Sequence, residues 1–150
     1  MSATTTGISE AAKILADTQR RIERHCDLPV TLSRRDAEDA VWEAWQATAE
    51  EWQISDSETA ITPEVRDTAI RFLELLPLGF PQPNVCGEPD GHISLEWYRN
   101  PHRIVSVSIG PANQLHWAAL IGSESPRGSI RFFDRIPETI RYYIARVFQG

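Results

Sequence analysis

The 150-residue chain has little cysteine and no long apolar run. Its two cysteines, Cys26 and Cys86, have neither the density of a disulfide-rich secreted scaffold nor the C-x-x-C spacing of a metal or redox pair. We therefore expect both thiols to be reduced. The sequence also lacks a stretch of about 18 apolar residues and a basic leader followed by an apolar segment. These absences predict a cytosolic protein with no membrane span and no signal peptide.

Strong catalytic motifs are also missing. The chain has no G-x-x-x-x-G-K-S/T, G-x-G-x-x-G, G-x-S-x-G, H-E-x-x-H or S-x-x-K sequence. Residue types that bind zinc occur at His25, Cys26, Cys86 and His92. The adjacent His25 and Cys26 would point about 100° apart on a helix, so they are poorly placed to bind one ion. We therefore expect no metal and no cofactor.

Acidic residues exceed basic residues by 21 to 15, which gives a formal net charge of −6. The excess lies between Asp36 and Glu58, where eight acids occur without a lysine or arginine. Such a segment repels nucleic-acid phosphates and complements a basic protein surface. The C-terminal part is locally basic through Arg127, Arg131, Arg135, Arg141 and Arg146. A regulator that binds DNA through these arginines is an alternative, although the negative net charge disfavours direct nucleic-acid binding.

The first third of the chain predicts two helices after a polar tail. We expect residues 1–7 to form a flexible tail, and the apolar spacing over residues 8–26 predicts the first helix. A second helix begins after Ser33, with acids on one side and an apolar arc of about 120° on the other. The acids are Asp36, Asp39, Glu43 and Glu50, and the arc contains Val41, Trp42, Trp45, Thr48, Ala49 and Trp52. We expect these tryptophans to lie in the core.

The rest of the chain predicts one more helix, a series of strands and a final helix. Thr62 and Pro63 have the order of an N-cap and a first helical residue, and the helix that they begin extends to about Leu76. Alternating apolar residues predict strands over 92–98, 105–109 and 115–121, a fourth over 130–133 and a short edge strand over 83–86. Pro137 begins the last helix.

These elements predict an α+β fold. N-terminal helices and a C-terminal helix would pack on one antiparallel meander sheet of 4–5 strands. We expect a single domain over residues 8–150, mainly helical over 8–76, with the sheet over 83–133 and the last helix over 137–149.

Polar residues gather at the first predicted hairpin. Asp90 lies in its turn, and His92 and Glu96 share the polar face of the following strand. The structural interpretation is a turn followed by solvated sheet residues, with His92 or Glu96 paired to Arg103 on the neighbouring strand. The alternative is a small hydrolase or transferase that uses His92, Glu96 and His116.

One part of the sequence resembles a known group of proteins. The segments that carry the resemblance follow Trp52 and are Ala69-x-x-Phe72-Leu73-x-Leu75-Leu76-Pro77, Pro81-x-Pro83-x-Val85 and Asp90-Gly91-x-Ile93-x-Leu95-Glu96-Trp97. Over about residues 52–117 the chain resembles a widespread group of small bacterial proteins of uncharacterised function. The resemblance implies an α+β domain, association with accessory or mobile genes, and no assigned activity or catalytic residue.

The sequence therefore favours a non-enzymatic bacterial accessory module that binds a protein partner with a basic surface. The predicted contacts are Asp39, Glu43 and Glu50 on the acidic helix side, and Glu96 and Tyr98 on the polar sheet face. A narrower alternative is an inhibitor or antitoxin-like protein that covers a basic, nucleic-acid-binding surface of its target. An exposed strand edge or the tryptophan-bearing helix could also pair two copies into a homodimer.

Overall fold

The computed structural model describes residues 34–51 and 59–149, apart from the side chains of residues 49–51. The tail expected over 1–7 and the helix expected over 8–26 lie outside these residues. The helices are α2 (Arg34–Glu51), α3 (Pro63–Leu75) and α4 (Glu138–Phe148), with one 3-10 turn, η1 (Pro111–Asn113). The strands are β1 (Asn84–Gly87), β2 (Ile93–Asn100), β3 (Arg103–Ile109), β4 (Gln114–Ile121) and β5 (Arg127–Arg131). The predicted α+β class is confirmed, and none of the described helices is long and apolar enough to cross a membrane.

The five strands form one antiparallel sheet in the order β1-β2-β3-β4-β5, which confirms the predicted meander. The predicted turn residues adopt the geometry that a tight connection requires. Gly91 has a φ of +88°, and the Asp90 carboxylate accepts a hydrogen bond from the backbone N–H of His92 at 3.1 Å. The side-chain oxygen of Asn100 accepts in the same way from the N–H of His102 at 2.9 Å. Side-chain hydrogen bonds of this kind reverse the chain between consecutive strands.

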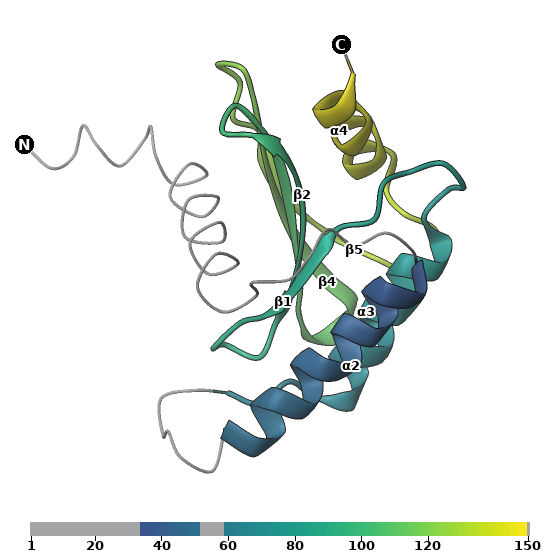
Figure 1. The fold of residues 1–150 in the computed structure, drawn as a ribbon, viewed down its shortest axis with the longest axis vertical. Coiled ribbons are helices and arrows are strands. Elements are labelled where there is room, and N and C mark those ends of the chain that lie inside the picture. The colour runs from purple at the N-terminus through teal and green to yellow at the C-terminus, as the bar shows by residue number, and fades with distance from the viewer. Residues whose placement is uncertain (1–33, 52–58, 150) are drawn as a thin grey trace, which may run out of the picture.

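The sheet has one apolar face, and the described helices lie on that side of it (Figure 1). Alternation along β2 directs Ile93, Leu95 and Trp97 to this face, and all three are buried. The corresponding residues of the neighbouring strands, among them Val107 and Leu115, are buried in the same cluster. The inward residues predicted for β2 are therefore confirmed.

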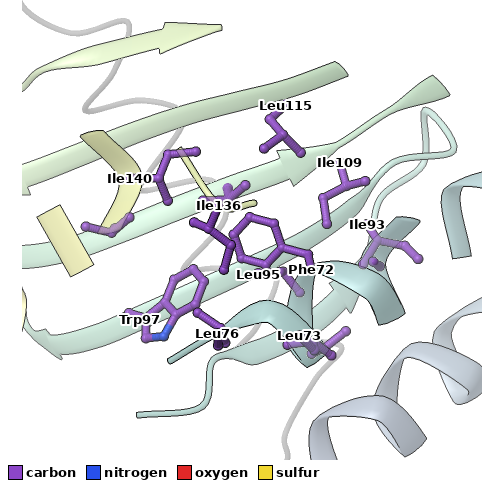
Figure 2. Close-up of a cluster of buried hydrophobic side chains, with 14 of the residues drawn as sticks. Phe72, Leu73, Leu76, Ile93, Leu95, Trp97, Ile109, Leu115, Ile136 and Ile140 are labelled. Atoms are coloured by element: carbon purple, nitrogen blue, oxygen red, sulfur yellow. The ribbon is translucent and has the colours of Figure 1, made fainter. Parts of the chain in front are cut away.

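Helix α3 covers the middle of the apolar face. Its first turn is capped, because the Thr62 hydroxyl accepts a hydrogen bond from the backbone N–H of Val65 at 3.2 Å. Phe72 projects from α3 into the cluster of sheet side chains (Figure 2), with its ring centroid 6.3 Å from that of Trp97 and 5.4 Å from that of Phe132. The predicted apolar stripe of this helix is buried throughout, at Val65, Ala69, Phe72, Leu73 and Leu76.

Helix α2 lies antiparallel to α3 and also contacts β1 (Figure 1). The two helices are tied together at both ends. The Arg34 guanidinium donates to the Leu76 carbonyl at 3.0 Å, and the Thr48 hydroxyl accepts from the N–H of Ile61 at 3.3 Å. The side of α2 that faces the core consists mainly of small residues, namely Ala37, Ala40, Val41 and Ala44.

The expectation that the tryptophan side of α2 lies in the core is wrong for Trp42, whose side chain is 42% exposed. Trp45 is half-buried, and Trp52 lies outside the described residues. The reason is the close approach of α2 to β1. Side-chain atoms of Thr48 and Ala44 lie 3.5 and 3.6 Å from the position that a Cβ on Gly87 would occupy. Because so little space separates the helix from the strand, small residues face the sheet and the tryptophans lie at the margin of the contact.

Helix α4 lies on the same side of the sheet as α3 (Figure 1), where it packs on β2, β3 and β4 and buries Ile140, Ile144 and Val147. Two arginines of the sheet satisfy carbonyls at its C-terminal end. The Arg103 guanidinium donates to the carbonyls of Arg146 at 2.7 Å and Gln149 at 3.0 Å, and Arg99 donates to the carbonyl of Gln149 at 3.1 Å. Cationic side chains stabilise the negative end of a helix dipole, so these contacts hold α4 on the sheet.

The role of Arg103 corrects one expectation from the sequence. The sequence predicts that Arg103 pairs with His92 or Glu96, but Arg103 alternates in step with Val105 along β3 and therefore points to the helix-covered side. His92 and Glu96 point to the opposite side of the sheet. The prediction of an ion pair between Arg103 and His92 or Glu96 is therefore wrong.

A second correction concerns the thiols. Cys86 on β1 is disulfide-bonded, so the expectation of a reduced thiol is wrong at this position. The other cysteine of the chain, Cys26, lies outside the described residues. Cys86 is buried, which limits the access of reducing thiols to its sulfur.

Replacing Phe72 with alanine should test the central helix-to-sheet contact. We expect Phe72→Ala to lower the free energy of unfolding by about 3–5 kcal/mol, because it removes a fully buried ring and leaves a cavity. Phe133→Ala is the matched control, since the Phe133 side chain is 61% exposed and its loss should change stability by less than about 0.5 kcal/mol. Urea unfolding followed by circular dichroism measures both, and equal losses would contradict the packing described above.

Candidate functional site

The outer side of α2 carries a surface that we call the acidic-aromatic ridge, formed by Asp39, Trp42 and Glu43. All three residues are exposed. Their spacing of three and four residues places them on one strip of the helix surface. Two of the predicted partner-binding acids therefore lie on the solvent side of α2. The third, Glu50, belongs to α2, but its side chain is outside the described part of the structure.

Arg66 of α3 holds the tryptophan of the ridge in place. Its guanidinium carbon lies 4.4 Å from the centroid of the Trp42 ring and 4.3 Å from that of Trp45. The two indoles meet edge to face with their centroids 5.5 Å apart, and Arg66 Nε donates to the Asp67 carboxylate at 2.9 Å. Cation-π contacts and aromatic pairs of this geometry each contribute about 0.5–1.5 kcal/mol. The Trp42 ring is therefore restrained although a large part of it faces solvent.

The two predicted contact residues of the sheet face differ in exposure. Tyr98 is exposed near the end of β2, as the prediction requires. Glu96 is only 2% exposed, so the expectation that it belongs to a solvated face is wrong. Glu96 lies in the interior of the sheet, where it is aligned with Asn84 of β1 and Ser106 of β3. A partner could reach its carboxylate only after rearrangement of the protein.

The face of the sheet opposite α3 carries a row of polar side chains. From β1 to β5, the register aligns Cys86, Ser94, Ser108, His116 and Ser129. Exposure increases along this row, from buried Cys86 and Ser94 through half-buried Ser108 to exposed His116 and Ser129. The β4 and β5 end of the row is therefore the accessible end.

His92 joins this row at the turn between β1 and β2. Its Nδ1 lies 3.0 Å from the Ser108 hydroxyl and 3.6 Å from an Asp90 carboxylate oxygen, and its ring stacks on His116 with centroids 6.0 Å apart. The Ser108 hydroxyl donates its single hydrogen to the Glu88 carboxylate at 2.9 Å. His92 Nδ1 must therefore be the donor to Ser108.

This geometry does not supply a serine nucleophile with its general base. A base must accept the hydroxyl proton, whereas Ser108 directs that proton to Glu88 and receives a hydrogen bond from His92. Glu96, the third member of the hydrolase or transferase hypothesis, is aligned with Ser106 and belongs to the next row. The described residues also contain no group of three or more His, Cys, Asp or Glu side chains able to hold a metal ion. The contacts of His92 instead tie the first turn of the sheet to β3.

The C-terminal arginines do not form one surface. Arg127 and Arg131 alternate in step with Ser129 and lie on the polar side of β5. Arg146 belongs to α4, on the other side of the sheet, and its guanidinium donates to the Glu124 carboxylate at 2.9 Å. This hydrogen bond raises the pKa of Arg146 further above its usual range. A DNA-binding surface requires its cations on one face, so this arrangement does not favour the DNA-regulator alternative.

Comparison with known proteins identifies no relative: no family model, curated protein or solved structure matches the chain. The resemblance over about residues 52–117 to small bacterial proteins therefore stays a prediction based on its motifs.

The hydrogen-bond order around Ser108 predicts the tautomer of His92. When neutral, the His92 imidazole should carry its proton on Nδ1, because the Ser108 hydroxyl has no second hydrogen to offer that nitrogen. Long-range ¹H–¹⁵N spectra of the labelled protein distinguish the two tautomers directly. Observation of the Nε2–H form would contradict the assigned order of donors.

Two serine variants provide the control. Ser108→Ala removes the acceptor of His92 Nδ1, so we expect it to release the tautomer preference and to lower the free energy of unfolding by about 1 kcal/mol. Ser129→Ala removes the hydroxyl that lies 2.8 Å from His116 Nδ1 at the exposed end of the row. This variant should leave both the His92 tautomer and the stability nearly unchanged.

Proposed function

We propose that the chain is a non-enzymatic protein-binding module that contacts a basic surface of its partner through the acidic-aromatic ridge. The observation that carries this proposal is the exposed Trp42, restrained by Arg66 and flanked on the same helix strip by Asp39 and Glu43. An apolar anchor and two like charges on one rigid strip form a compact contact surface.

Trp42 supplies the apolar anchor of this surface. Tryptophan is among the residues whose truncation most weakens protein interfaces, because a single ring fills a pocket and excludes water. Ordering a mobile side chain on binding costs about 0.5–1.5 kcal/mol. The contacts with Arg66 and Trp45 reduce that cost, since the ring is already restrained in the free protein.

Asp39 and Glu43 supply charge and orientation. No lysine or arginine follows Arg35 in α2, and the Arg66 charge beside Trp42 is paired with Asp67, so Asp39 and Glu43 give the ridge a net negative charge. Such a field attracts a basic partner, accelerates association and disfavours acidic surfaces. Because both carboxylates are exposed, salt should screen their attraction.

A narrower form of the proposal is an inhibitor or antitoxin-like protein whose target uses the same basic surface to bind nucleic acid. The ridge would then compete with phosphates for that surface. Once a partner is identified, competition between the chain and a short duplex for that partner tests this form. Simultaneous binding of both would leave the module proposal intact and reject the inhibitor form.

We also propose the origin and the cellular location of this module. A bacterial origin rests on the resemblance over residues 52–117, and a cytosolic location rests on the lack of a long apolar run among the 150 residues. Cys86 is disulfide-bonded, and disulfides are less common in proteins of a reducing cytosol. Fractionation of the cells that produce the protein would locate it.

Charge reversal and truncation of the ridge should separate binding from folding. We expect Asp39→Lys combined with Glu43→Lys, or Trp42→Ala alone, to weaken capture of the partner from a cell extract by at least about tenfold, which corresponds to about 1.4 kcal/mol. The thermal midpoint should change little in the charge-reversal variant, because both carboxylates are exposed. Trp42→Ala also loses the contacts with Arg66 and Trp45, so a modest fall of its thermal midpoint is expected and the charge-reversal variant separates binding from stability. Quantitative mass spectrometry of the captured proteins at two salt concentrations provides the measurement.

The matched control is Glu74→Lys combined with Glu138→Lys. Both residues are exposed, lie on α3 and α4 and undergo the same total change of charge. Partner capture should survive in this variant. Equal loss in the ridge variants and in the control would mean that net charge alone governs binding, and unchanged capture by the ridge variants would reject the proposal.

A further inference from the structure

Strand β5 is an exposed edge of the sheet. Among the described strands it pairs with β4 alone, at one end of the order. Most of its residues are exposed, and the Ile130 side chain is 41% exposed. An edge of this kind presents backbone donors and acceptors that a further strand could use.

The hydrogen bonds to β4 identify the backbone groups of β5 that face outward. The N–H of Ala119 donates to the Pro126 carbonyl and the N–H of Phe132 donates to the Asn113 carbonyl, both at 2.9 Å. Hydrogen-bonded pairs recur at every second residue of an antiparallel ladder. By this parity, Gly128 and Ile130 direct their backbone groups toward β4. Ser129 and Arg131 direct theirs away from the sheet.

The side chains beside this edge have a distinct chemistry on each face. Arg127 and Arg131 lie on the polar face, on either side of Ser129. On the helix side, Ile130 is accompanied by the Trp117 ring, which lies over Gly128 so closely that an added Cβ would be 2.9 Å from its Nε1. The Trp117 ring in turn stacks on Tyr143 of α4 with centroids 5.4 Å apart. The edge therefore has a basic face and an apolar face.

We propose that the free edge of β5 binds an extended acidic segment of another protein, which adds to the sheet as a further strand. The outward backbone groups of Ser129 and Arg131 would supply the ladder hydrogen bonds. Alternate residues of the added segment would point to the two faces, so an acid on the polar face would meet Arg131. Apolar residues on the other face would extend the surface of Ile130 and Trp117. This binding surface is separate from the ridge and does not depend on the function proposed for it.

Charge argues against a second copy of the chain as the occupant. Antiparallel pairing of two β5 strands in the register with the greatest overlap would place Arg127 of one copy opposite Arg131 of the other, on the same face. Like charges directly opposite each other destabilise a strand pair. An acidic segment removes this repulsion and provides attraction at Arg131.

The probe for this proposal is a synthetic peptide of about seven residues that alternates glutamate and valine, with a lysine-valine peptide of equal length as the charge control. Hydrogen exchange of the full chain is followed by NMR. In the free protein we expect Gly128 and Ile130 amides to be protected and Ser129 and Arg131 amides to exchange rapidly. The glutamate-valine peptide should slow exchange at Ser129 and Arg131 and should bind at least about fivefold more tightly than the control.

Substitutions on β5 complete the test. Ser129→Pro removes an outward N–H and leaves the hydrogen bonds of Gly128 and Ile130 to β4, so peptide binding should be lost while β4 stays protected. Arg131→Glu should abolish the preference between the two peptides, because it leaves one positive and one negative charge on that face, and Arg135→Glu, an exposed residue outside the strand, should not. If Ser129→Pro disrupts β5 itself, Arg131→Glu still tests whether the edge binds the acidic peptide. The ridge variant Asp39→Lys with Glu43→Lys should bind the peptide normally.

Three outcomes would overturn the proposal. The first is rapid exchange at Ser129 and Arg131 at saturating peptide, which would show that no strand is added. The second is equal binding of the two peptides by the unmodified chain, which would remove the role of the arginines. The third is concentration-dependent protection of Ser129 and Arg131 without peptide, which would identify a second copy of the chain as the occupant.

Discussion

The apolar face of the sheet must be covered, and the contact between Phe72 of α3 and Trp97 of β2 lies in the middle of that cover (Figure 2). The other elements take their positions from it. Helix α4 covers the remaining part of the face, where Arg103 satisfies its terminal carbonyls. Helix α2 is then left beside α3 and β1, with one side buried and the other in solvent. The ridge is exposed because α3 and α4 already cover the apolar face of the sheet and α2 packs only beside α3 and β1.

Much of the fold could be predicted from the sequence because each strand and turn carries its own local signal. The alternation of Ile93, Leu95 and Trp97 predicts a strand and its inward face, and Asp90 with Gly91 predicts the turn before it. The rotation of α2 could not be predicted in this way. A helical projection groups apolar residues, but it contains no information on how closely the helix approaches Gly87, and that distance decides whether alanine or tryptophan faces the sheet.

The candidate sites were less predictable, since they depend on neighbours distant in sequence. The acids Asp39 and Glu43 were identified from their pattern, but the role of Arg66 requires the relative placement of α2 and α3. The burial of Glu96 could not be predicted either, because alternation predicts which face of the sheet a residue occupies and not whether that face is covered. The outward edge of β5 depends on the order of strands in the sheet, which local periodicity does not contain.

The proposed function depends on contact between the ridge and a partner through Trp42. The most direct measurement replaces Trp42 with a photoreactive benzoyl-phenylalanine in the producing cells and analyses the crosslinked products, with the same replacement at exposed Glu138 of α4 as the reference. We expect one dominant protein to be crosslinked from position 42, in lower yield at higher salt, and not to be crosslinked from position 138. No crosslinked protein from position 42, or the same protein in equal yield from both positions, would contradict it.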